Sequence, residues 1–111
     1  MVLYRAVSTA EKEDIQTHKH FRTQINTLEA KQFFSSESAV VEYVIASFKR
    51  RFIPPYTHIL SVSIDDQCFQ HVTHNRQELD GHDAINIYQQ HLPHFNKFVT
   101  FIEVNVIDNY L

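Results

Sequence analysis

The sequence predicts an α+β domain in which two main helices pack on a mixed or antiparallel sheet of about five to six strands. The apolar patterns follow the order strand, helix, strand, helix and then several strands, which is typical of α+β domains rather than alternating α/β folds. The chain has 111 residues, of which 43% are hydrophobic and 13% aromatic, enough for one apolar core. We therefore expect residues 1–111 to form a single domain.

A strand and a capped helix open the chain. Val2–Val7 is rich in β-branched and aromatic residues, and Arg5 is its only charged residue. Ser8 and Glu11 have the spacing of a capping box, so a helix is expected to begin there and run towards Lys19. The apolar stripe of this helix is thin, which favours a position on the surface.

The clearest helix follows a short strand over residues 31–34. Residues 20–30 lose periodicity and predict an irregular connection, after which Ser35 or Ser36 can cap the helix. Apolar and small residues recur at helical spacing: Val40, Tyr43, Val44, Ser47 and Phe48. The basic run 49–51 lies in the last turn, and two prolines at 54 and 55 end the helix.

Alternation marks the next strand, over residues 58–64. Leu60, Val62 and Ile64 point to one face, which we expect to pack against the helix before it, and two serines point to the other. Residues 67–82 are polar and predict an irregular segment. Gly81, the only glycine, marks a turn within it.

The last third of the chain predicts two more strands. Residues 84–88 form the first, followed by a turn of helix over 89–92 that Pro93 ends or redirects. Residues 98–107 form the second, with apolar side chains on both faces. This pattern indicates a central strand, or a strand whose second face meets a partner.

Composition narrows the classes of function. A formal net charge of −3 argues against a nucleic-acid-binding protein, and no apolar stretch is long enough to predict a membrane helix. One cysteine cannot form an intramolecular disulfide, which favours a reducing, cytoplasmic setting. One glycine excludes the glycine-rich loops that cradle phosphates.

Histidine and cysteine do not predict a metal site or a nucleophile. The histidines at 71 and 74, and at 91 and 94, have helical spacing but lack the further ligands that zinc requires. Cys68 matches no nucleophile signature, and free cysteines are usually buried. We therefore expect no bound metal and a structural thiol.

The remaining candidate residues suit a nucleotide. Tyr4 and Arg5 lie on the first strand, Ser35 and Ser36 lead from a strand into a helix, and Glu103 lies on the last strand. Arginine pairs with diphosphates, serine hydroxyls position a ribose, and a glutamate can hold a ribose hydroxyl as positive charge develops.

This constellation resembles the ADP-ribosyltransferase-like domains. The resemblance covers the N-terminal half, through Leu3-Tyr4-Arg5 and the run from Lys31 to Ser36 followed by an alanine-containing helix. It implies an NAD site in which Arg5 takes the arginine role, Ser35 and Ser36 the serine-motif role, and Glu103 the catalytic role. NAD would then be a substrate rather than a resident cofactor.

Two functions therefore stay open. The first is a binding or interaction protein without catalysis and without a cofactor, whose partner is a second copy or another protein. The second is a small ADP-ribosyltransferase-like protein that binds NAD or a related nucleotide in an Arg/Ser/Glu cleft. They differ in whether Arg5, Ser35 and Glu103 converge.

Overall fold

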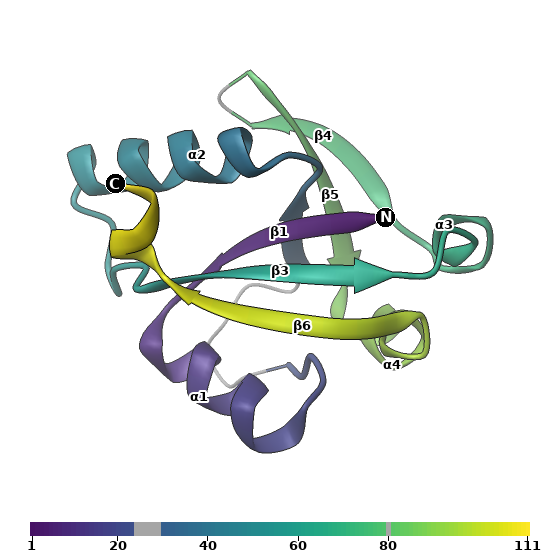
Figure 1. The fold of residues 1–111 in the computed structure, drawn as a ribbon. Coiled ribbons are helices and arrows are strands. Elements are labelled where there is room, and N and C mark those ends of the chain that lie inside the picture. Colours follow the sequence, from purple (N-terminus) through teal and green to yellow (C-terminus); the bar gives the residue numbers. More distant parts are fainter. Residues whose placement is uncertain (24–29, 80) are drawn as a thin grey trace.

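One antiparallel sheet of six strands organises the protein in the computed structural model, which describes residues 1–23, 30–79 and 81–111. The strand order is β4-β5-β2-β1-β3-β6 (Figure 1). The strands are β1 Val2–Val7, β2 Ala30–Phe34, β3 His58–Ile64, β4 Asn75–Leu79, β5 His82–Tyr88 and β6 Val99–Val106. The helices are α1 Thr9–His18, α2 Glu37–Lys49, α3 Cys68–His71 and α4 Leu92–Asn96, with short 3₁₀ turns η1 Gln89–His91 and η2 Ile107–Tyr110. The predicted α+β class is confirmed.

Helices lie on both faces of the sheet and enclose two apolar clusters. On one face α1, α3 and α4 bury Ile15, Cys68 and Phe95 against the sheet. On the other face α2 and η2 bury Val40, Val44 and Ile107. Figure 1 shows α2 and the C-terminal turn on one side of the strands and α1 with α4 on the other. No helix among the described segments is long and apolar enough to cross a membrane.

The packing partner predicted for α2 is wrong. Leu60, Val62 and Ile64 are buried together as expected, but on the face that α1, α3 and α4 cover. The β3 residue packed with α2 is Ile59. Phe48, predicted to face the core, is 41% exposed, because its position on α2 lies beyond the edge of the buried stripe.

Of the two alternatives for the last strand, the central position in the sheet is wrong, and the second, a face that meets a partner, stays a prediction. β6 is an edge strand, paired with β3 alone, although its sequence is apolar on both faces. Its side chains are intermediate or exposed throughout, and Phe101 is 61% exposed. The apolar pattern therefore reflects exposed hydrophobic surface and not burial on two sides.

The segment predicted to be irregular contains ordered elements. Within residues 67–82 the chain forms α3 and then β4, which pairs along β5. β4 is polar because it is the other edge of the sheet, and its side chains are mostly exposed. Its strand conformation comes from the ladder with β5 rather than from an apolar pattern. Gly81 has a φ of +84°, which suits the turn between them.

A serine and a proline define where α2 and α4 begin. Ser36, and not Ser35, caps α2: its hydroxyl accepts a hydrogen bond from the Ala39 amide at 3.2 Å. Pro93, predicted to end or redirect the helical turn before it, does not end the helical stretch, because η1 stops at His91 and Pro93 lies in the first turn of α4. Proline suits this position because the first amides of a helix have no partner within it.

Replacing Val44 by Asp tests the packing of α2. Val44 is fully buried, so the carboxylate would lose its hydration, and we expect a loss of several kcal/mol in the free energy of unfolding, about 3 or more. The neighbouring change Ile45→Asp is the control, because that side chain is already 38% exposed. Chemical denaturation would measure both, and equal losses would contradict the placement of α2.

Candidate functional site

The guanidinium of Arg5 is paired inside the protein. Its Nε donates to Glu11 Oε2 at 2.7 Å and its Nη2 to Glu11 Oε1 at 2.8 Å. Its Nη1 donates to the carbonyl of Gln32 at 3.0 Å. This two-pronged geometry is the strongest form of an arginine–carboxylate pair, and the Arg5 side chain is only 16% exposed. Arg5 is therefore occupied by structural contacts.

Lys31 completes a buried ion network. Its Nζ lies 3.3 Å from Glu11 Oε1, and both side chains are at most 10% exposed. Burial alone would raise the pKa of Glu11, but Arg5 and Lys31 outweigh it and hold the pKa below its ordinary value. Burial, and then the charge of Arg5, lowers the pKa of Lys31. The network joins α1 to β1 and β2.

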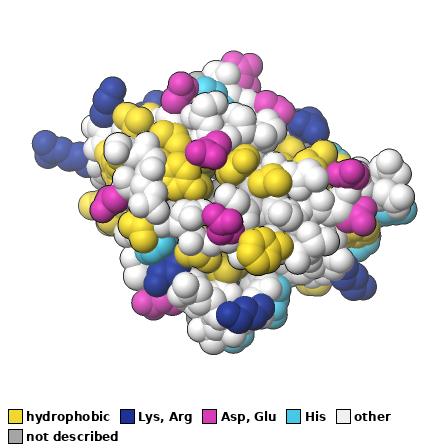
Figure 2. Space-filling view, in the orientation of Figure 1, with side chains coloured by type: hydrophobic (Ala, Val, Ile, Leu, Met, Phe, Trp, Pro, Cys, Tyr) yellow, Lys and Arg dark blue, Asp and Glu magenta, His cyan; other side chains and the backbone are white. Residues whose placement is uncertain are grey.

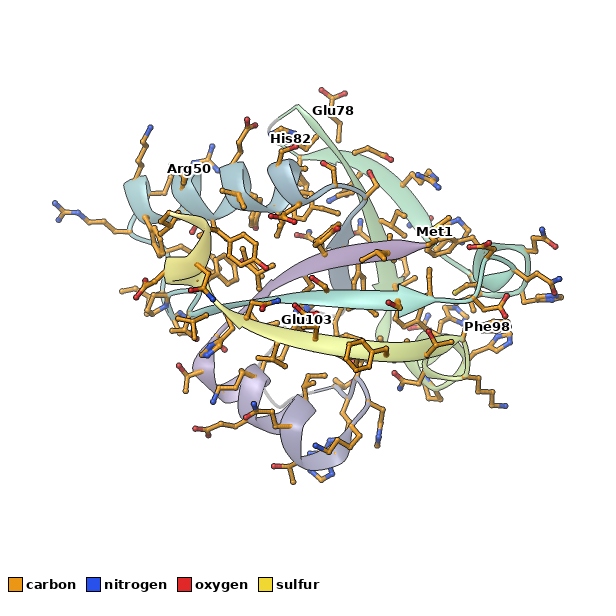
Figure 3. All side chains as sticks on the ribbon, viewed as in Figure 1. Met1, Arg50, Glu78, His82, Phe98 and Glu103 are labelled. Carbon is orange, nitrogen blue, oxygen red and sulfur yellow. The ribbon has the colours of Figure 1, made fainter. Side chains whose placement is uncertain are left out.

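Glu103 lies on the face of the sheet opposite to Arg5. Tyr4 on β1 is paired with Ser61 on β3, and Ser61 is paired with Glu103 on β6. Paired positions on neighbouring strands place their side chains on one face, whereas consecutive residues alternate. Arg5 follows Tyr4 and so points the other way. Glu103 is labelled on β6 in Figure 3, and the side-chain amide of Asn105 donates to its Oε1 at 2.9 Å.

The two serines lie near Tyr4 but away from Glu103 and Arg5. They follow Phe34, which is the partner of Tyr4 across β1 and β2. Ser35 is exposed, and the hydroxyl of Ser36 is engaged as the cap of α2. The described structure therefore brings Tyr4 and the serines to one region and does not form a cleft that contains both Arg5 and Glu103.

The histidine and cysteine side chains have structural surroundings. Cys68 is fully buried, as predicted, and burial together with Asp65 raises the pKa of its thiol to about 11. His71 stacks on the ring of Phe98 at 5.7 Å, and His94 lies 5.6 Å from the same ring. Within residues 1–23, 30–79 and 81–111 no cluster of His, Cys, Asp or Glu is arranged to hold a metal ion.

A groove lies between α1 and β6. It encloses about 370 Å³ and is lined by Ile15, Gln16, Lys19, Val99, Thr100, Phe101, Ile102 and Val104. One wall is a helix and the other is the edge of the sheet. Most of the lining is apolar, with Gln16 and Lys19 at its rim.

The backbone groups of β6 point alternately toward β3 and toward the free edge of the sheet. At the two ends of the β3–β6 pairing, the Ile107 amide donates to Thr57, and the Phe98 carbonyl accepts from Asp65. Successive residues of an antiparallel strand point their backbone groups alternately to one side and to the other. Ile107 and Phe98 both point to β3 although simple alternation would place them on opposite sides, because the bulge near residue 100 adds one residue to β6 between them. The amides and carbonyls of Ile102 and Val104 therefore point away from β3.

The charges beside the groove are basic. Lys19 lines one end, where it caps α1 in a left-handed conformation with φ of 63°. Lys12 lies two turns earlier on the same side of the helix. Burial, and then the charge of Lys12, lowers the pKa of His58 at the start of β3. An occupant of the groove would therefore meet the positive charge of Lys19.

The sequence carried a signal for only part of this site. Glu11 was identified as a capping residue, yet its carboxylate is buried against Arg5, six residues away. A lone arginine in an apolar strand requires a partner, and the nearest glutamate along the chain was the available clue. The groove joins segments some eighty residues apart along the chain, and no local pattern links them.

Replacing Glu11 by Gln tests the ion network. The change leaves two buried cations without their carboxylate, and we expect a loss of about 3 kcal/mol at neutral pH. Since the folded pKa of Glu11 lies below 4.5, the stabilisation is present above that pH and is lost as the pH falls through the folded pKa. Denaturation from pH 7 to pH 3 should show the two proteins converging. Asp83→Asn, in an exposed pair with Arg76, should cost at most about 1 kcal/mol.

No family model, no curated protein and no solved structure matches the chain.

Proposed function

We propose that the protein is a non-catalytic binding module that accepts an extended segment of a partner protein along β6. One observation carries this proposal. The residues whose backbone groups point outward from the sheet edge, Ile102 and Val104, also place their side chains in the groove beside α1. An added strand would gain main-chain hydrogen bonds and side-chain contacts from the same residues.

The character of the β6 edge supports this function. Over Val99–Val106 it contains no proline and no lysine, the residues that usually protect an edge from pairing. β4 at the opposite edge carries Arg76 and Glu78 and is exposed over most of its length. An exposed apolar edge beside a groove is the usual architecture for strand addition.

The nucleotide function has no comparable support. It requires Arg5 and Glu103 to act on one molecule, and they lie on opposite faces of the sheet. Arg5 would also have to release Glu11 before it could bind a diphosphate. NAD binding thus stays a prediction that a melting experiment with NAD can test.

Hydrogen exchange along β6 tests the backbone arrangement without any ligand. The amides of Ile102 and Val104 should exchange quickly, because they point to solvent, whereas those of Glu103 and Asn105 should be protected by β3. NMR would resolve the individual amides. Equal protection of all four amides would contradict the proposal that the β6 edge is free to pair with an added strand.

Filling the groove tests the binding function. We would select extended octapeptides from a displayed random library and then compare their affinity for Gln16→Trp and Glu13→Trp. Gln16 lines the groove and is exposed, so tryptophan there should reduce affinity at least tenfold with little change in stability. Glu13 is exposed on the same helix outside the groove, and its variant should bind normally. Failure to select any peptide, or a melting temperature raised by NAD alone, would contradict the proposed function.

A further inference from the structure

A second exposed apolar surface lies at the end of α2, away from the groove. Every side chain from Phe48 to Pro55 is exposed. Within this stretch Phe48 is 41% exposed, Phe52 49% and Ile53 84%. We call residues 48–53 together with Ile45 the α2-end surface. In Figure 2, hydrophobic and basic side chains gather at the end of the molecule where α2 ends.

Local contacts hold this stretch in one shape. The Arg51 amide donates to the Phe48 carbonyl at 3.1 Å and the Phe52 amide to the Ser47 carbonyl at 3.0 Å. The ring of Phe52 stacks on Tyr56, with centroids 5.5 Å apart and planes at 19°. The apolar side chains are therefore presented by a hydrogen-bonded turn.

Positive charge is interleaved with these apolar side chains. Lys49 lies between Phe48 and the turn, and Arg51 precedes Phe52. The sequence contains no acidic residue between Glu42 and Asp65. Complementing the helix dipole accounts for a lysine in the last turn of α2, but not for an exposed phenylalanine and isoleucine beyond it.

We propose that the α2-end surface docks the protein onto membranes that contain anionic phospholipids. Apolar side chains flanked by cations suit the boundary between headgroups and acyl chains: the apolar groups enter the boundary and the cations meet anionic headgroups. The Ile53 side chain is 84% exposed, so it can enter this boundary without giving up a packed contact. This docking is independent of β6.

Vesicle co-sedimentation tests this inference. We expect binding to vesicles of phosphatidylcholine with about one-third phosphatidylserine, weak or no binding to phosphatidylcholine alone, and loss of binding at high salt. Ile53→Ser should weaken binding about tenfold. Lys49→Glu with Arg51→Glu should weaken it more than twentyfold, since each cation contributes about fivefold at an anionic surface.

A matched pair of substitutions controls for net charge. Arg76→Glu with Lys97→Glu makes the same change in charge at exposed positions outside the α2-end surface and outside the groove, and should leave most of the binding intact. Circular dichroism would check that all variants stay folded, as their exposed positions predict. Equal losses from both pairs, full binding by Ile53→Ser, or equal binding to neutral vesicles would overturn the proposal. So would self-association abolished by Ile53→Ser without any vesicle binding, which would assign the surface to a second copy.

Discussion

The ion pair between Arg5 and Glu11 fixes the position of α1, and most of the features described above depend on that position. A carboxylate from the first turn of α1 meets a guanidinium in the middle of β1. The ion pair is bidentate, and both side chains are largely buried. Removing Glu11 would leave Arg5 and Lys31 buried without their carboxylate, and removing Arg5 would leave Glu11 with Lys31 alone, so the helix and the sheet are constrained together. The helix wall of the groove therefore stands where this pair holds it.

The pairing with Glu11 also limits the ability of Arg5 to bind a ligand. An arginine in an apolar strand must find a partner, and the chain supplies one within the first turn after the strand. A bound diphosphate would have to compete with a carboxylate that is already oriented and desolvated. Arg5 is accordingly better explained as a determinant of architecture than as a ligand-binding residue.

Sequence patterns predicted the central elements well and the edges poorly. β1, β2 and β3, α1 and α2 follow from periodicity and capping because each buries one continuous face. β4 has no apolar alternation, and pairing with β5 alone makes it a strand. β6 has an apolar pattern on both faces yet lies at an edge, since composition does not distinguish burial from exposed hydrophobic surface.

Strand register, which cannot be derived from composition, places the candidate nucleotide-binding residues on different faces of the sheet. Side chains of successive residues in a strand point to opposite faces of the sheet. The pairing register across β1, β3 and β6 therefore places Glu103 on the same face as Tyr4 and on the opposite face from Arg5. Register depends on which strands pair, and pairing is a long-range property. The groove could not be predicted for the same reason.

The difference between the two edges of the sheet limits how copies of this protein can assemble. Open-ended growth of a sheet requires two edges that both accept a strand, so that each added molecule presents a new edge. Here β6 carries one charged residue, Glu103, among mostly apolar ones, whereas β4 carries Arg76 and Glu78 on an exposed polar strand. If two molecules meet through β6, both competent edges are used and only β4 remains at each end. Association through β6 alone would therefore close at two molecules.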